Sequence, residues 1–237
     1  MDILVIVPAY NEGQNIETVI NDVKKEAPQA EIMVINDGSS DQTGFIAEAT
    51  QKATVINLPY NLGIGGAVQA GFKYAKRNGF QTVVRVDGDG QHPAQGIAMV
   101  LEPILNGEAD MVIGSRFLYS SGEKPRSVLA RRIGQKIIGF VLTIISGQKI
   151  TDASSGFRAY NEEVINLLNK YYPADYPEPE EIIFLKKNNF RIKEVGVPMK
   201  IRTKGSSSIT SVRSIYYALK VALSLFIGIL RNPIIKK

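Results

Sequence analysis

Short apolar runs alternate with amphipathic stretches through the first half of the chain. The runs are typical of strands, and the stretches between them carry apolar residues at helical spacing. The predicted strands are Ile3–Val7, Glu31–Ile35, Val55–Leu58, Val83–Val86 and Met111–Gly114, and the predicted helices are Asn15–Lys25, Asp41–Gln51, Gly65–Arg77 and Pro93–Leu105. Strands that alternate with helices predict parallel β-α-β units. We therefore expect an α/β fold, with a mostly parallel central sheet and helices on both faces.

The second half is less regular. Its predicted elements are an apolar helix at Ile133–Ile145, a polar segment at 151–160, a proline- and acid-rich segment at 173–181, a helix that begins at Ile182–Leu185, a strand at Ile192–Val197 and an apolar closing helix at Ile215–Leu230. The 16 residues of the closing helix would extend about 24 Å, which is short of a hydrocarbon core of about 30 Å. With basic residues around it, this helix predicts a peripheral contact with a membrane surface or with a small membrane-protein partner. A helix buried against the sheet is the alternative.

Composition limits the classes of function. A chain of 237 residues can form one large α/β domain, with or without an appendage. It has no cysteine, which excludes disulfides, thiolate metal sites and a cysteine nucleophile and fits a reducing compartment. The N-terminus enters a strand without a basic region or cleavage site, so we expect no signal peptide and a cytoplasmic location.

Charge is distributed unevenly. Residues 1–123 carry 8 Lys and Arg against 15 Asp and Glu, whereas residues 124–237 carry 20 against 8. A basic half predicts an anionic partner, such as nucleic acid, phospholipid headgroups or a phosphorylated substrate.

Two carboxylates follow the fourth predicted strand, in the sequence Val-Asp-Gly-Asp-Gly-Gln-His. Asp87 and Asp89 are two positions apart, so at a strand end both can point to the same side. Such oxygen ligands can hold Mg²⁺ or Mn²⁺, which in turn binds a diphosphate. An acidic, glycine-rich turn without a ligand is the structural alternative.

Polar segments also follow other predicted strands. They are Pro8-Ala9-Tyr10-Asn11-Glu12, Asn36-Asp37-Gly38-Ser39-Ser40-Asp41 and Gly114-Ser115-Arg116. Ligands of parallel α/β sheets bind beyond the carboxyl ends of the strands. We therefore expect the polar segments after the first, second and fourth strands to converge on one edge of the sheet.

In this order and spacing, the segments resemble those of the inverting family 2 glycosyltransferases, which have the GT-A fold. More narrowly, the chain is similar to the polyprenyl-phosphate sugar transferases, such as dolichol-phosphate mannose synthase. The resemblance covers about residues 1–208 and implies a GT-A domain, with a nucleotide-binding half at 1–123 and an acceptor half at 124–208. Residues 209–237 would then form a C-terminal amphipathic helix.

The resemblance also implies roles for individual residues. Nucleotide binding would involve Pro8, Tyr10, Glu12, Asp37, Asp87, Gly88 and Arg202; metal binding would involve Asp87, Asp89 and Gln91; and catalysis would involve Asp89, Arg116, Asp152 and Arg158. The segment from Asp152 to Arg158 resembles the family's acceptor-side Asp-x-x-Ser-Gly-Phe-Arg motif, and Arg202 and Gly205 resemble a late loop that closes over the diphosphate. Ser208 departs from the lysine that ends this loop in many relatives, and Lys204 could replace its charge.

The acceptor determines which further groups are needed. A polyprenyl phosphate, with a second pKa of about 6, is largely anionic at neutral pH and requires arginines rather than a base. A sugar hydroxyl in cell-surface polysaccharide synthesis would require a carboxylate as base, for which Glu180 and Asp152 are the candidates. The donor could be a UDP-, GDP- or dTDP-sugar. No nucleic-acid partner is expected, and a homo-oligomer is possible.

Other interpretations remain at this point. A non-catalytic subunit could retain the fold, and a sugar nucleotidyltransferase could share it, although such an enzyme usually has a glycine-rich loop with lysine after the first strand. Arg158 could pair locally with Asp152 as a structural salt bridge. Glu178, Glu180 and Glu181 could form a solvated acidic loop. His92 is expected to be a structural neighbour of the metal loop.

Overall fold

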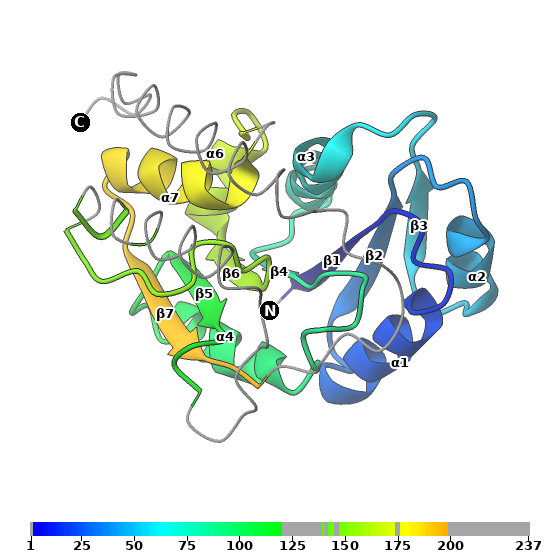
Figure 1. The fold of residues 1–237 in the computed structure, drawn as a ribbon, viewed down its shortest axis with the longest axis horizontal. Helices are drawn as coiled ribbons and strands as arrows, with labels where there is room; N and C mark the ends of the chain where they lie inside the picture. The colour runs from blue at the N-terminus through cyan, green and yellow to red at the C-terminus, as the bar shows by residue number, and fades with distance from the viewer. Residues whose placement is uncertain (1, 120–138, 140–141, 145–146, 174–175, 199–237) are drawn as a thin grey trace, which may run out of the picture.

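The computed structural model describes residues 2–119, 139, 142–144, 147–173 and 176–198. Within them, a seven-stranded sheet has the order β3-β2-β1-β4-β6-β5-β7 (Figure 1). The strands are β1 (Ile3–Ala9), β2 (Glu31–Asn36), β3 (Thr54–Asn57), β4 (Thr82–Arg85), β5 (Met111–Ser115), β6 (Arg158–Asn161) and β7 (Ile192–Gly196). Neighbouring strands are parallel except at β6, which runs antiparallel to both β4 and β5. The prediction of a mostly parallel sheet is confirmed.

Helices cover both faces of this sheet. They are α1 (Ile16–Glu26), α2 (Thr43–Ala49), α3 (Gly63–Arg77), α4 (Gly96–Leu105), α6 (Glu162–Leu168) and α7 (Pro177–Lys187). Buried residues of α3, α6 and α7 belong to one core cluster, and those of α1, α2 and α4 belong to a second. The predicted α/β architecture, with helices on both faces, is therefore confirmed.

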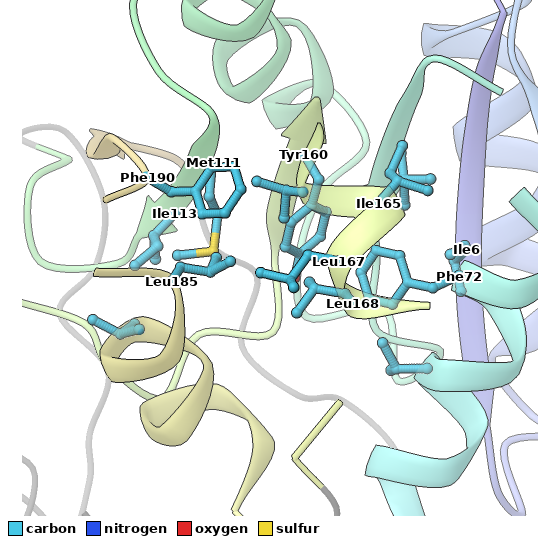
Figure 2. Close-up of a cluster of buried hydrophobic side chains, with 14 of the residues drawn as sticks. Ile6, Phe72, Met111, Ile113, Tyr160, Ile165, Leu167, Leu168, Leu185 and Phe190 are labelled. Carbon is cyan, nitrogen blue, oxygen red and sulfur yellow. The ribbon is translucent and has the colours of Figure 1, made fainter. Parts of the chain in front are cut away.

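Alternation along the strands produces the two cores. In β1, Leu4 and Ile6 face the first core, whereas Val5 and Val7 face the second. Because both faces of such a strand are buried, its sequence is a continuous apolar run rather than an alternating one. Figure 2 shows part of the first core, where Phe72 of α3 packs edge-on against Tyr160 of β6 with ring centroids 5.0 Å apart.

The second half contains elements that the sequence pattern did not indicate. The segment expected to be polar and irregular contains β6, and helix α6 follows it directly. Helix α7 begins at Pro177 rather than at Ile182. Proline is tolerated in the first turn of a helix, and acidic residues there favour the helix dipole. The interpretation of this segment as a solvated acidic loop is wrong, because Glu181 is fully buried.

Some predictions fall outside the described residues. The closing helix at 215–230 lies wholly outside them, and most of the predicted helix at 133–145 does too. Among the helices of the described ranges, none combines the length and the apolar character needed to cross a membrane.

Candidate active site

The loops that follow β1 and β2 interlock at the carboxyl edge of the sheet. The backbone N–H of Asn11 donates to Ser39 Oγ, and the N–H of Ser40 donates to Asn11 Oδ1, each at 2.9 Å. Asn11 adopts a left-handed φ of 56°, which asparagine tolerates better than most residues. The N–H of Glu12 donates to Thr43 Oγ1 at 2.9 Å. The expected convergence of these two polar segments is confirmed.

Asp37 connects this edge to the loop that follows β3. Its side chain is buried, and Oδ1 accepts a hydrogen bond of 2.7 Å from the N–H of Leu62. The next residue, Gly38, has a φ of 65°, and a Cβ there would lie 2.6 Å from the nitrogen of Asn61. The close approach of the two loops therefore requires glycine at this position.

The remaining residues of the predicted nucleotide loop differ in exposure. Pro8 is buried within β1, whereas the Tyr10 side chain just beyond the strand is 49% exposed. The Glu12 carboxylate accepts a hydrogen bond of 2.7 Å from Asn15 Nδ2 at the start of α1. The exposed Tyr10 ring at the sheet edge is thus available to a ligand, as the resemblance implies, and its role stays a prediction.

Asp87 and Asp89 lie in the loop that follows β4. The loop packs against the end of β1, since a Cβ on Gly88 would lie 3.0 Å from the carbonyl oxygen of Pro8. Asp89 Oδ1 accepts a hydrogen bond of 3.0 Å from the N–H of Gln91, which fixes the turn. Burial raises the pKa of the Asp87 carboxyl, but the positive charges of Arg85 and Arg116 outweigh it, so the pKa is lowered and Asp87 is ionised at neutral pH.

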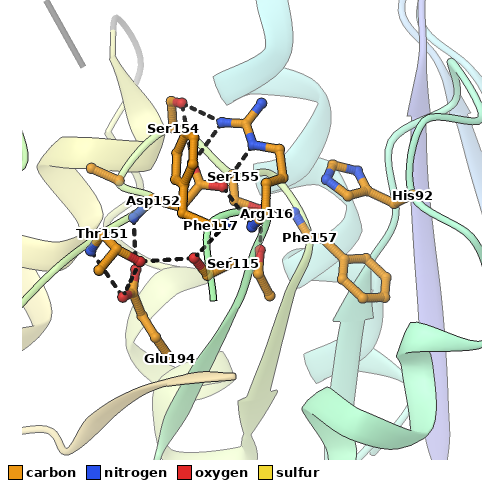
Figure 3. A network of polar contacts seen from close by, with 12 residues as sticks. His92, Ser115, Arg116, Phe117, Thr151, Asp152, Ser154, Ser155, Phe157 and Glu194 are labelled. Atoms are coloured by element: carbon orange, nitrogen blue, oxygen red, sulfur yellow. Dashed lines mark hydrogen bonds and ion pairs between the residues drawn. The ribbon is translucent and has the colours of Figure 1, made fainter. Parts of the chain in front are cut away.

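The predicted acceptor-side segment packs directly on this loop. A Cβ on Gly156 would lie 2.5 Å from Asp87 Oδ2, so any larger residue would displace that carboxylate. Next to it, the ring of Phe157 stacks on His92 with centroids 5.2 Å apart and planes 9° from parallel (Figure 3). Burial lowers the pKa of His92. His92 is therefore a neutral packing neighbour of the loop, as expected from the sequence.

Arg116 and Asp152 form an ion pair that is supported by three hydrogen bonds. The backbone N–H and Nε of Arg116 donate to Asp152 Oδ2 at 3.0 and 2.6 Å, and Nη2 donates to Oδ1 at 2.5 Å (Figure 3). Nη2 also donates to Ser154 Oγ at 2.7 Å. The Asp152 side chain is 1% exposed. Burial lowers the pKa of Arg116, but the hydrogen bonds and negative charge of Asp152 raise it by more. The net pKa is therefore raised, and the guanidinium remains charged.

Arg158 does not pair with Asp152. It is completely buried, and its Nη1 donates to Glu181 Oε2 at 2.7 Å, while Nε and Nη2 donate to the carbonyl oxygens of Ser155 and Ala153 at 2.9 and 3.0 Å. The interpretation of an Arg158–Asp152 salt bridge is wrong. Arg158 stabilises the backbone of the acceptor-side segment through these two carbonyl oxygens. Its predicted catalytic role stays a prediction.

Two charged residues near the metal loop, Arg85 and Glu178, were not predicted to belong to the site. Arg85 is 2% exposed, and its Nη2 lies 2.7 Å from Glu178 Oε1 and 3.4 Å from Asp87 Oδ1. Arg85 therefore joins the first turn of α7 to the candidate metal ligand. The available signal was position, because Arg85 and Asp87 are two residues apart and share a face.

The donor groups fit a hard divalent cation. Asp87 and Asp89 could supply carboxylate oxygens and Gln91 an amide oxygen, the ligands that Mg²⁺ and Mn²⁺ prefer. In the described part of the chain, His, Asp and Glu side chains form no group of three or more that could hold a metal alone. One or two carboxylates can hold such a metal together with substrate phosphates, and the metal role of these residues stays a prediction.

The other predicted residues are placed less fully. Glu180 lies in the first turn of α7 and is half-buried. Arg202, Lys204 and Gly205 lie outside the described residues, so their predicted roles at the diphosphate stay predictions.

Comparisons with known proteins identify the family. The sequence profile of the family described as Glycosyl transferase family 2 matches residues 4–168. Among curated proteins, the UDP-N-acetylglucosamine–dolichyl-phosphate N-acetylglucosaminyltransferase of Methanococcus voltae is 31% identical over 213 residues, which cover 82% of this chain and 84% of the relative. The polyprenol monophosphomannose synthase of Mycolicibacterium smegmatis is 34% identical over 172 residues, which cover 70% of this chain and 64% of the relative.

Solved structures share the fold. Glucosyl-3-phosphoglycerate synthase of Mycobacterium tuberculosis, in complex with Mn²⁺, UDP and glucosyl-3-phosphoglycerate, superposes with a TM-score of 0.73 at 18% identity. The match covers 96% of this chain and 79% of the synthase chain. At this identity the similarity establishes the fold alone.

Proposed function

Because the chain belongs to glycosyl transferase family 2, we propose that it transfers a sugar from a nucleotide-sugar to a polyprenyl phosphate, with inversion at the anomeric carbon. The family, its GT-A fold and the glycosyltransferase activity agree with the expectation from the motifs. The proposed acceptor draws on relatives that are named for dolichyl-phosphate and polyprenol substrates.

The state of Asp152 is the observation that carries this choice of acceptor. Both of its carboxylate oxygens accept hydrogen bonds from Arg116, and the side chain is 1% exposed. A general base must reach the proton that it removes. The carboxylate of Asp152 is held in one orientation by Arg116, and an acceptor hydroxyl cannot reach it because it is buried. A hydroxyl acceptor would lose one of its two candidate bases. An acceptor phosphate, which is already anionic, needs no base and is attracted by arginine.

The proposed reaction balances without a proton transfer. An oxygen of the acceptor phosphate forms a bond to the anomeric carbon from the side opposite the leaving group. The bond between that carbon and the nucleoside diphosphate breaks, and its electron pair stays on the diphosphate. Arg116 adds positive charge where negative charge develops, and Arg202 is predicted to do the same. A Mg²⁺ or Mn²⁺ ion held by Asp87, Asp89 and Gln91 would neutralise the departing diphosphate.

The acceptor test compares three substrates with one donor. We expect transfer to a polyprenyl monophosphate, and none to the unphosphorylated polyprenol or to a sugar hydroxyl. Glu180→Gln should keep most of the activity, and Glu163→Gln, an exposed acid on α6, is the matched control. Loss of activity in folded Glu180→Gln alone, together with transfer to a hydroxyl, would overturn the phosphate acceptor in favour of a general base.

The donor is identified in a separate experiment. UDP-, GDP- and dTDP-sugars are screened by thermal shift in the presence of Mn²⁺, since a ligand that binds only the folded state raises its melting temperature. A shift with one nucleotide, absent in EDTA, supports both the donor and the metal. Release of sugar from that donor without acceptor would further separate an enzyme from a non-catalytic subunit that only binds the nucleotide.

A further inference from the structure

A carboxylate from strand β7 holds the loop that carries Asp152. Glu194 Oε1 accepts a hydrogen bond of 2.9 Å from the N–H of Asp152. Glu194 Oε2 accepts from the N–H and the hydroxyl of Thr151, at 2.9 and 2.8 Å (Figure 3). The sequence pattern assigned β7 only to the sheet, and no site residue was predicted there.

This loop is not held by the backbone hydrogen bonds of a helix or a strand. Thr151 and Asp152 lie outside any helix or strand, so their backbone N–H groups need acceptors from elsewhere. A single side chain supplies both acceptors, and hydrogen bonds to an ionised carboxylate are stronger than neutral ones. The backbone conformation at Asp152 therefore depends on Glu194.

Two paths lead from Glu194 to Arg116. In the first, Asp152 receives the guanidinium of Arg116 through Nε and Nη2. In the second, the Thr151 hydroxyl lies 2.8 Å from the Ser115 hydroxyl, and Ser115 directly precedes Arg116 at the end of β5. The positions of both the side chain and the backbone of Arg116 therefore depend on the carboxylate of Glu194.

Arg116 in turn contacts the segment that packs on the candidate metal loop. Its Nη2 donates to Ser154 Oγ at 2.7 Å, and two residues further along, a Cβ on Gly156 would lie 2.5 Å from Asp87 Oδ2. A small shift of a charged group at a reacting centre can lower the rate strongly, because stabilisation of the transition state depends on prior alignment.

We propose that Glu194 is a positioning residue, which acts on sugar transfer by fixing Arg116 through Thr151 and Asp152. The inference rests on the proposed function, in that Arg116 is taken to contact the phosphate groups. Glu194 itself touches neither Arg116 nor the metal loop in the hydrogen bonds of the described residues.

A double-mutant cycle tests the proposal. Glu194→Gln keeps the size of the side chain but places an amide N–H₂ against a backbone donor. We expect it to lower kcat/KM for transfer by roughly 10- to 100-fold, the scale of a misplaced catalytic group. In an Arg116→Gln background, the same change should lower kcat/KM by less than about 3-fold, because residues that act as one unit are not additive.

A second readout does not depend on turnover. The Kd of the nucleoside diphosphate with Mn²⁺ is measured by calorimetry for the same four proteins, and we expect the same loss of additivity there. Glu108→Gln is the matched control, because Glu108 also pairs with a β7 side chain, Lys193, but both partners are about half exposed and neither one bonds to Arg116 in the hydrogen bonds and ion pairs of the described residues. It should leave kcat/KM and Kd unchanged.

The possible results distinguish the positioning role of Glu194 from the role of Arg116 at the phosphates. Equal losses from Glu194→Gln in both backgrounds, or no loss in a folded protein, overturn the positioning role alone. Wild-type transfer in Arg116→Gln overturns the assignment of Arg116 to the phosphates and the inference with it. If Glu194→Gln does not fold, Thr151→Val replaces it, since it removes the hydroxyl between Glu194 and Ser115 without changing the shape of the side chain.

Discussion

At the scale of single residues, charge pairing decides which side chains remain available to a ligand. Asp152 is 1% exposed and bound to Arg116, and Arg158 and Glu181 are both fully buried in their own pair. Asp87, by contrast, keeps a side chain that is 28% exposed beside its partner Arg85. The carboxylate that the sequence assigned to a metal is therefore the one with a path to a ligand, whereas the second candidate base is enclosed.

Asp89→Asn tests the metal loop directly. Asparagine keeps an oxygen that can accept from the N–H of Gln91, so the turn should persist. We expect transfer to fall by roughly 10²–10³ or more, because the substitution removes charge that would hold the metal at the developing diphosphate. Rates with and without excess EDTA are compared alongside. Undiminished turnover of the wild-type protein in EDTA would show that no metal is needed.

Gly156→Ala tests the contact between the acceptor-side segment and Asp87. The added methyl group would lie 2.5 Å from Asp87 Oδ2, so the carboxylate must turn away. We expect Mn²⁺ to bind roughly 10- to 100-fold more weakly, the range seen when a group that orients a metal ligand is removed. Electron paramagnetic resonance of free Mn²⁺ measures this, and an unchanged urea midpoint serves as the folding control. Wild-type Mn²⁺ affinity would show that Asp87 does not bind the ion in this orientation.

At the scale of elements, the sequence predicts the regular half of the fold well. β1 and β2 are continuous apolar runs because both of their faces are buried. β6 was missed because it consists of only Arg-Ala-Tyr-Asn, and its buried arginine is compensated by a residue 23 positions away. Helix α6 did carry a signal, since the Asn161 side chain accepts from the N–H of Val164 and caps the helix.

Some residues of the site could likewise be predicted from the sequence, and others could not. Motif residues on adjacent parallel strands could be brought together by topology alone, as the hydrogen bonds of Asn11 with Ser39 and Ser40 confirm. Arg85–Glu178 and Asp152–Glu194 join positions 93 and 42 residues apart, and no local pattern predicts such pairs. Long-range pairs of this kind become visible only when the packing of the second half is known.

Glu181 gives the junction of α7 and β6 a dependence on pH. Burial raises the pKa of Glu181 above the ordinary value of a glutamate, although Arg158 acts in the opposite direction. A pKa that is higher in the folded than in the unfolded state contributes stability at low pH, and this contribution is lost as the pH rises through the folded value. Glutamine at this position does not titrate.

We therefore expect the wild-type protein to gain stability relative to Glu181→Gln as the pH falls from 8 to 4, a range that includes the ordinary pKa of glutamate. Urea unfolding of both proteins at the two pH values measures the difference, and using the difference removes the contribution of other carboxylates. A gap that stays constant, or one that changes in the opposite direction, would contradict a raised pKa at this site.

At the scale of the whole molecule, the uneven charge of the chain matches the predicted division into a nucleotide-binding half and an acceptor half. Both halves contribute to one sheet, since β7 pairs with β5. Residues 124–237 carry the excess of Lys and Arg, as expected of the half that meets a lipid phosphate. A peripheral location on the cytoplasmic face of a membrane stays a prediction, as does the division at residues 123 and 208.

The segment predicted to make this contact is 215–230. Its sequence is almost entirely apolar, with Lys220 within it and Arg213 and Arg231 beside it. Basic residues near an anionic surface contribute about 1 kcal/mol each, and apolar side chains add to this when they enter the interface. Contact there would bring the active site to the depth of an acceptor phosphate, which cannot leave the bilayer because of its polyprenyl chain.

We expect the full chain to float with anionic liposomes at low salt, and a chain truncated after Ser211 to stay in the soluble fraction. Neutral liposomes and high salt should both weaken binding of the full chain, because salt screens exposed charges. Transfer to a short-chain, water-soluble acceptor is measured for both proteins, so that a truncation that damages the catalytic domain is recognised. If the full chain and the active truncated chain both remain unbound to anionic liposomes, the segment does not anchor the enzyme and the peripheral location is wrong.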